Sequence, residues 1–224
     1  MNDGQPVDRL SGTGKLPVLA MFGVVATRLI QMIASPRSAI RHVLISSDLR
    51  GGVIATCVVW AAIGFVVSGT ALIGDGVERA GPATLRVAFA GATVAAGAGV
   101  GFTALAALCL HLSAYAVGGA GRFRQMHVTL GFASITGVLW IPGLVAADAL
   151  DSGVGAIVRR VVMAVSVTWW IYIVTFSVRH LYAVPWRAVP GAIFLAAIGV
   201  ISVLVVLLVL VFFIALLAVM VIVP

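Results

Sequence analysis

The few charged residues of this chain divide it into five long stretches that carry no charge at all. The uncharged stretches are residues 51–74, 87–121, 125–147, 161–178 and 188–224. A membrane-spanning helix needs about 20 mostly apolar residues, and each stretch is long enough for one helix. Only 9% of the 224 residues are charged and 62% are hydrophobic, so a soluble domain would lack the polar residues to cover its surface. The same composition excludes intrinsic disorder, which requires low hydrophobicity.

We therefore predict an all-α fold, a polytopic bundle of five transmembrane helices preceded by a polar tail and an amphipathic helical segment at the membrane surface. The spans are expected at about residues 51–74, 87–117, 126–147, 161–181 and 191–221. The expected cytoplasmic tail, interfacial segment and transmembrane domain cover residues 1–15, 16–50 and 51–224.

The basic residues predict which side of the membrane each loop faces, because Arg and Lys near spans are retained in the cytoplasm. With the N-terminus inside, the inner segments hold ten basic residues against three acids, and the outer loops hold four against four. The whole formal charge of +7 then lies on the inner face. This distribution favours a topology with the N-terminus inside and the C-terminus outside. It also accounts for the excess of basic residues, so no binding of nucleic acid is needed to explain it. Arg in place of Lys, with abundant Ala, Val and Gly, points to a GC-rich prokaryotic genome, so the expected location is the plasma membrane.

The residues ahead of the first span predict two helices that lie in the interface. Polar residues recur at four-residue spacing through the first, which is typical of an amphipathic helix. Ser35 and Pro36 then form a helix start. Arg28, Arg37 and Arg41 are expected to meet anionic headgroups, and a solvated polar face is the alternative.

The densest motif joins the second and third stretches, where three glycines precede two arginines that flank one aromatic residue. The glycines permit a tight helix stop. The arginines place two cations at the cytoplasmic headgroups, with the aromatic ring between them in the interface. The residues of the motif are Gly118, Gly119, Gly121, Arg122, Phe123, Arg124 and Gln125.

This motif resembles the glycine loop of the Yip domain family of five-span membrane proteins. Residues 28–37, the Phe132-Ala133-Ser134 stretch and residues 169–180 are similar to further elements of that family, so the resemblance covers about residues 28–220. One departure is Thr136-Gly137, where the family often has a proline. The resemblance implies a protein that works through contacts. Eukaryotic members associate with Rab GTPases and with each other, a role that is not transferred to this chain.

Two features inside the spans point to helix contacts. Gly97 and Gly101 form a small-residue face that suits close packing within the chain or between copies in a homo-oligomer. His111 is the ionisable residue well inside a span, which makes it a functional candidate or a hydrogen-bonding helix contact. An interfacial belt is expected after the fourth span, from Tyr182, Trp186 and Arg187.

The distribution of acidic residues argues against a catalytic or metal-binding site. All seven lie in loops or in the N-terminal segment, and neither a nucleophile–base pair nor metal-ligand spacing is recognisable. We therefore expect no catalytic, cofactor or metal site and no enzyme. The expected function is a scaffold or adaptor that contacts the lipid bilayer and other membrane proteins. The alternative is a small passive transporter or channel subunit.

Overall fold

The computed structural model describes residues 18–46, 49–74, 82–141, 143, 145, 150 and 152–222. Regular structure within these residues is helical throughout, without a strand, which confirms the predicted all-α fold. The polar tail at 1–15 and all seven acidic residues lie outside the described residues.

Among the described residues, four helices are long and apolar enough to cross a membrane. They are α3 (Leu49–Gly74), α4 (Pro82–Ala116), α7 (Ser152–Leu181) and α8 (Val189–Ile222). They overlap four of the five uncharged stretches, and α4 and α7 begin earlier than predicted, before Arg86 and Arg159. An unbroken apolar run in lipid has to satisfy its backbone groups within a helix. This composition indicates a membrane-embedded protein.

The remaining uncharged stretch is not one regular α-helix in the described part. It forms α5 (Phe123–Ala133), which continues as the tighter 3-10 helix η1 (Ser134–Leu139). The Ser134 hydroxyl donates to Gly131 O at 2.6 Å, and the Thr136 hydroxyl donates to Ala133 O at 3.0 Å. Such bonds from a side chain to the preceding turn can bend helices, so Ser134 and Thr136 contribute locally to the break.

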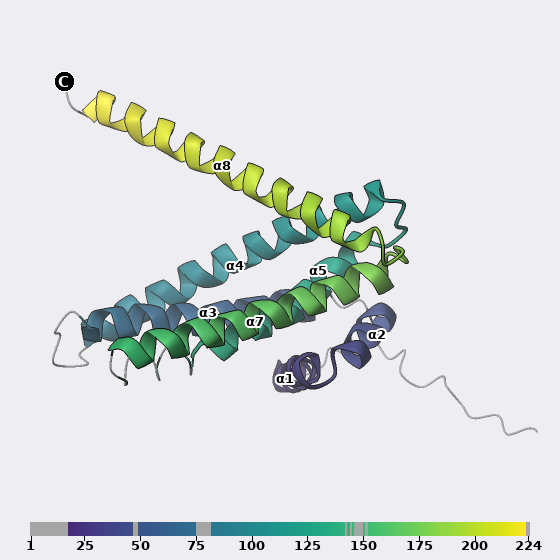
Figure 1. Cartoon of the computed structure of the whole chain (residues 1–224). Coiled ribbons are helices and arrows are strands. Elements are labelled where there is room, and N and C mark those ends of the chain that lie inside the picture. Colours follow the sequence, from purple (N-terminus) through teal and green to yellow (C-terminus); the bar gives the residue numbers. More distant parts are fainter. Residues whose placement is uncertain are drawn as a thin grey trace, which may run out of the picture.

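Two helices precede the first span, α1 (Val18–Ala34) and α2 (Pro36–Ser46). Ser35 separates them, and its carbonyl oxygen accepts the first backbone bonds of α2 from Ser38 and Ala39 at 3.0 and 3.1 Å. The predicted helix start at Ser35-Pro36 is therefore present. Figure 1 shows α1 nearly end-on while α3 and α7 run across the picture, so α1 crosses the long helices steeply.

The inner face of α1 is apolar and packs against α3, α5 and η1. Val25, Leu29 and Met32 are buried there, with Met32 fully inaccessible. Their spacing of four and three residues is the helical period of a face turned toward a core. Thr27 and Ile30 on other faces of the helix are exposed.

Glycines bring α3 and α4 together, but they are not the pair expected from the sequence. A Cβ added to Gly64 would lie 2.6 Å from Gly91 O, and one added to Gly99 would overlap the side chain of Trp60. Gly97 and Gly101 are exposed and have no neighbour within 4 Å of an added Cβ. Their predicted packing role within the chain is therefore not seen among the described residues, and the predicted contact between copies stays a prediction.

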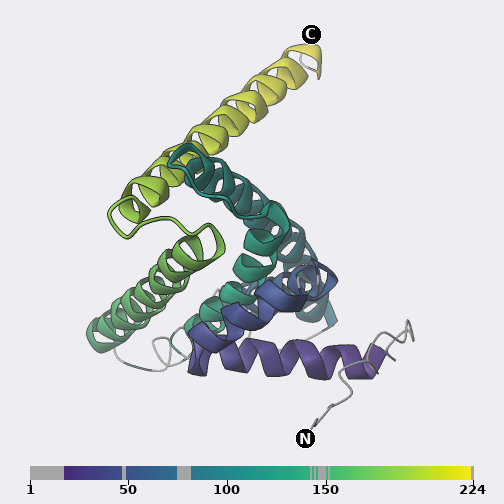
Figure 2. The same cartoon turned by 90° about the vertical axis from the view of Figure 1, so that its right-hand side faces the viewer.

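The last helix, α8, diverges from the bundle (Figures 1 and 2). Val189, Ala192 and Ala196 near its start are buried, and its packing is mainly on α4. Every residue from 201 to 215 is exposed. The first turns of α8 therefore hold it to the bundle, and the following turns present apolar side chains to the surroundings.

Candidate functional site at the loop junction

The glycine motif stops α4 by a defined backbone arrangement. Gly118 has a φ of +87°, a conformation that strains residues with a Cβ. Gly119 N–H donates to Ala114 O at 2.8 Å, and Gly118 N–H donates to Tyr115 O at 3.0 Å. This pair of bonds is the Schellman motif, which satisfies carbonyls that a helix C-terminus leaves unpaired. The predicted helix stop is therefore present at these glycines.

The same loop packs tightly on the connection between α7 and α8. We call residues 118–122 together with residues 181–188 the loop junction. Ala120 N–H donates to Tyr182 O at 3.0 Å. A Cβ added to Gly121 would lie 2.6 Å from Leu181 O, and one added to Gly119 would lie 2.9 Å from the Tyr182 Cβ. Gly119 and Gly121 thus permit two backbone segments to approach more closely than side chains would allow.

A polar contact at the centre of the loop junction joins α4 to the α7–α8 connection. His111 Nδ1 and Tyr182 Oη form a hydrogen bond of 2.8 Å. Tyr182 is 1% exposed, and burial raises the pKa of its phenol well above the ordinary value. The ring of Phe123 lies 6.0 Å from that of His111. Of the two interpretations of His111, the geometry supports the hydrogen-bonding helix contact.

Tyr182, expected in an interfacial belt, is buried in the protein, because the glycine loop covers its ring. Trp186, by contrast, is 56% exposed. The guanidinium of Arg179 lies 5.7 Å from the centroid of the Trp186 ring, and its Nη1 donates to Val184 O at 2.8 Å. Arg179 therefore fixes the α7–α8 connection through Val184 and Trp186.

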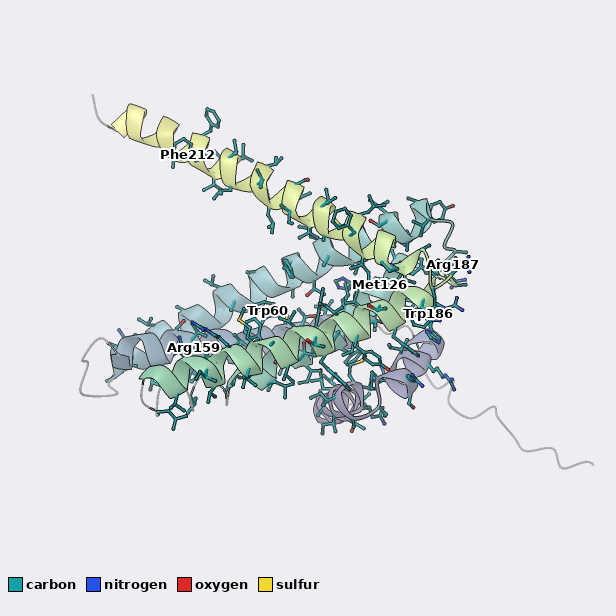
Figure 3. The ribbon with its side chains drawn as sticks, viewed as in Figure 1. Trp60, Met126, Arg159, Trp186, Arg187 and Phe212 are labelled. Carbon is teal, nitrogen blue, oxygen red and sulfur yellow. The ribbon has the colours of Figure 1, made fainter. Side chains whose placement is uncertain are left out.

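A basic and aromatic surface surrounds the loop junction. Arg122, Arg124 and Arg187, which we call the basic rim, are all exposed. The partly exposed rings of Phe123 and Trp186 lie next to them in the chain. Figure 3 shows Trp186 and Arg187 at the end of the bundle opposite Arg159. The three guanidinium groups give this part of the described surface a positive charge.

Two arginines of α1 and α2 also contact aromatic rings of the bundle. The guanidinium of Arg28 lies 5.8 Å from the Phe132 centroid, and that of Arg37 lies 5.5 Å from the Phe176 centroid. These distances are within the range of cation–π attraction. Arg28 and Arg37 thus also help to dock the N-terminal helices on the bundle, while Arg37 and Arg41 are exposed and accessible for the predicted headgroup contacts.

Gln125, the last residue of the motif, lies in the first turn of α5, where its N–H donates to Arg122 O at 3.1 Å.

The side chains exposed at this end of the bundle suit recognition through positive charge and aromatic surface. The described residues contain no group of three or more side chains that could hold a metal ion. Arginine beside exposed aromatic rings suits anionic headgroups or an acidic protein surface.

The four long apolar helices indicate a helical, membrane-embedded protein, and its loop junction bears exposed basic and aromatic side chains. Comparison with protein-family models, with curated proteins and with solved structures found no match to this chain. The resemblance to the Yip domain family therefore remains a prediction from the sequence motifs.

Proposed function

We propose that this chain is a non-enzymatic, Yip-like integral membrane protein that acts as a scaffold or adaptor in membrane organisation or trafficking-like processes. The observation that supports the proposal most is the loop junction, where tight glycine packing and the His111–Tyr182 bond hold the exposed basic rim in a fixed position. A preorganised charged surface favours recognition because less ordering entropy is lost on binding.

The proposed arrangement has five spans, with the N-terminus in the cytoplasm and the C-terminus outside, in a prokaryotic plasma membrane. The ends of α4 and α7 and the starts of α5 and α8 meet at the loop junction, so their arginines share one side, as the positive-inside rule requires. The steep crossing of α1 over the long helices supports an interfacial position for the N-terminal segment.

The proposed partners are anionic headgroups, further copies of this chain and other membrane proteins. Crosslinking in native membranes, affinity recovery and mass spectrometry test this. Arg122→Gln with Arg124→Gln is expected to lower the recovered partners and anionic lipid several-fold. Screening over about 10 Å at 0.1 M salt should weaken the wild-type recovery in the same direction. The matched control is Arg86→Gln with Arg160→Gln, which removes the same charge from two other exposed positions, and unchanged recovery from both doubles would refute the role of the rim.

Association between copies is proposed to use the exposed face of Gly97 and Gly101. Without a small-residue neighbour in the described chain, these positions leave backbone accessible for close helix contact. Replacing both by Leu should abolish crosslinked dimers in membranes. Undiminished dimers would place the interface elsewhere.

A passive transporter or channel subunit is the second candidate. The break between α5 and η1 favours it, since discontinuous helices form solute sites in many transporters. Purified protein in liposomes should then pass small solutes or ions faster than empty liposomes. Impermeable liposomes would remove this candidate and leave the contact function.

A further inference from the structure

A pocket of about 390 Å³ lies among α3, α4, α5, η1 and α7. Trp60, which lines it, lies about 16 Å along α3 from the start of that helix at 1.5 Å per residue, and a hydrocarbon core is about 30 Å thick. Figure 3 shows Trp60 well inside the length of the bundle. The pocket is therefore near the middle of the proposed spans, away from the loop junction. Its lining includes Trp60, Phe102, Ala106, Leu130, Thr136 and Val167.

The pocket is open on one side, between α4 and α7. The main packing of α7 is on α5 and η1, and Figure 2 shows α7, the green helix, standing apart from α4. Phe102 of α4 is 41% exposed and Val167 of α7 is 40% exposed, so these two residues form the mouth. Ala106 and Leu130 are buried and form the floor. Because α4 and α7 are apolar enough to cross a membrane, the mouth is continuous with the surface that these helices present to lipid.

The accessible surface of the pocket is almost wholly apolar. The polar side-chain atoms of Trp60, Trp140 and Ser166 are inaccessible, so these residues turn carbon toward the cavity. The hydroxyls of Ser134 and Thr136 donate to backbone carbonyls of the preceding turn. Apolar cavities exclude water, and a polar solute would lose its hydration without gaining hydrogen bonds in return. The occupant must therefore be apolar.

The size and depth of the pocket narrow the choice of an apolar occupant. An apolar cavity of about 150 Å³ takes up benzene, and this pocket is more than twice as large. An occupant gains the dispersion contacts that an empty cavity leaves unmade. At mid-depth the mouth meets acyl chains, because the headgroups lie about 15 Å away at the edge of the hydrocarbon core. An acyl chain is slender and flexible enough to enter between two helices that stand apart.

We propose that this pocket binds one acyl chain of a bilayer phospholipid, which enters sideways between α4 and α7 and lies against the Trp60 ring. The headgroup of this lipid stays at the membrane surface, so the outer half of the chain is the part that reaches the pocket. The protein thus holds one lipid in place, in addition to the lipid that covers its exposed helices. This site is independent of the contact function proposed above.

A phospholipid with a photoreactive diazirine in the outer half of one chain tests the proposal. The full chain is illuminated in nanodiscs that contain this lipid, and the labelled residues are mapped by mass spectrometry. We expect labels on the floor residues Ala106 and Leu130, as well as on the exposed turns of α8. A diazirine beside the ester group should label the floor several-fold less. Labels confined to exposed residues, or equal labelling of the floor by the two lipids, would overturn the proposal.

Closing the mouth distinguishes the bound chain from the surrounding lipid. Val167→Phe places a ring at the mouth and should lower the labelling of Leu130 several-fold, while the labelling of α8 stays unchanged. Val165→Phe is the matched control, since Val165 is 58% exposed on the same helix and does not line the pocket. Ala106→Leu fills the floor itself and should give the same loss at Leu130, so it remains informative where the ring at position 167 turns outward. Undiminished labelling in both pocket variants, or an equal loss in the control, would refute the site.

Discussion

Replacing Tyr182 by phenylalanine removes one hydroxyl from the centre of the loop junction and leaves the ring in place. The phenol is buried, and its 2.8 Å bond is the contact that the structure gives to His111 Nδ1. A net hydrogen bond contributes about 1 kcal/mol, and a buried group left without a partner costs about 1–3 kcal/mol. Since His111 is only partly buried, we expect Tyr182→Phe to lower the free energy of unfolding by about 1–2 kcal/mol.

Tyr115→Phe is the matched control for this variant. Its ring also neighbours His111, with 6.3 Å between centroids, but Tyr115 is 66% exposed. Exposed substitutions away from special contacts usually change stability by less than about 0.5 kcal/mol. Both variants are measured by reversible unfolding in mixed micelles with increasing dodecyl sulfate, where helix content is followed by circular dichroism.

A double-mutant cycle with His111→Leu isolates the pair. We expect a coupling of about 0.5–1.5 kcal/mol between positions 111 and 182, and close to none between positions 111 and 115. Additive effects at 111 and 182, or equal losses in the two tyrosine variants, would show that the hydrogen bond does not stabilise the junction.

Two further predictions concern the same region. Gly121→Ala should destabilise the fold by about 1–3 kcal/mol, because its Cβ would lie 2.6 Å from a backbone oxygen of Leu181. Gly101→Ala, in an open helical position, should be neutral or stabilise by up to about 1 kcal/mol. A larger loss of stability in Gly101→Ala than in Gly121→Ala, measured in the same unfolding assay, would contradict the packing at the loop junction. Because burial raises the pKa of Tyr182, the contribution of its protonated phenol to the free energy of unfolding is fully present below the ordinary tyrosine pKa of about 10. This contribution is lost as the pH rises above that value. Above a pH of about 10, the free energy of unfolding of the wild type should therefore fall by up to about 1.4 kcal/mol per pH unit, whereas Tyr182→Phe lacks that slope. Parallel plots of unfolding free energy against pH for the two proteins would refute the burial argument.

The long helices could be predicted from the sequence because their signal is local. Uninterrupted apolar residues determine α3, α4, α7 and α8 almost regardless of their neighbours. The break after Ala133 could not be predicted in the same way. Ser134 and Thr136 donate to the preceding turn there, but a hydroxyl bond to the preceding turn also occurs at Thr56 in the unbroken helix α3, so these residue types alone do not indicate a break.

The candidate site was only half visible in the sequence because its two parts are far apart along the chain. The glycines and arginines from 118 to 124 form a recognisable motif, but nothing in it indicates that the loop folds over Tyr182. Similarly, Gly97 and Gly101 have the spacing of a packing face, yet Gly64 and Gly91 make the contact. Which glycines meet depends on the relative rotation of two helices, which spacing in one helix does not determine.

The splayed geometry of α8 makes this helix sensitive to the thickness of the bilayer. Its 34 residues measure about 51 Å at 1.5 Å per residue, well beyond a hydrocarbon core of about 30 Å, and a helix in such mismatch tilts. Because only its first turns are anchored to the bundle, a thicker or thinner membrane changes the inclination of the exposed turns around that anchor. The anchored turns adjoin the loop junction. A change in the inclination of α8 therefore acts on the segment that holds Trp186 and Arg187.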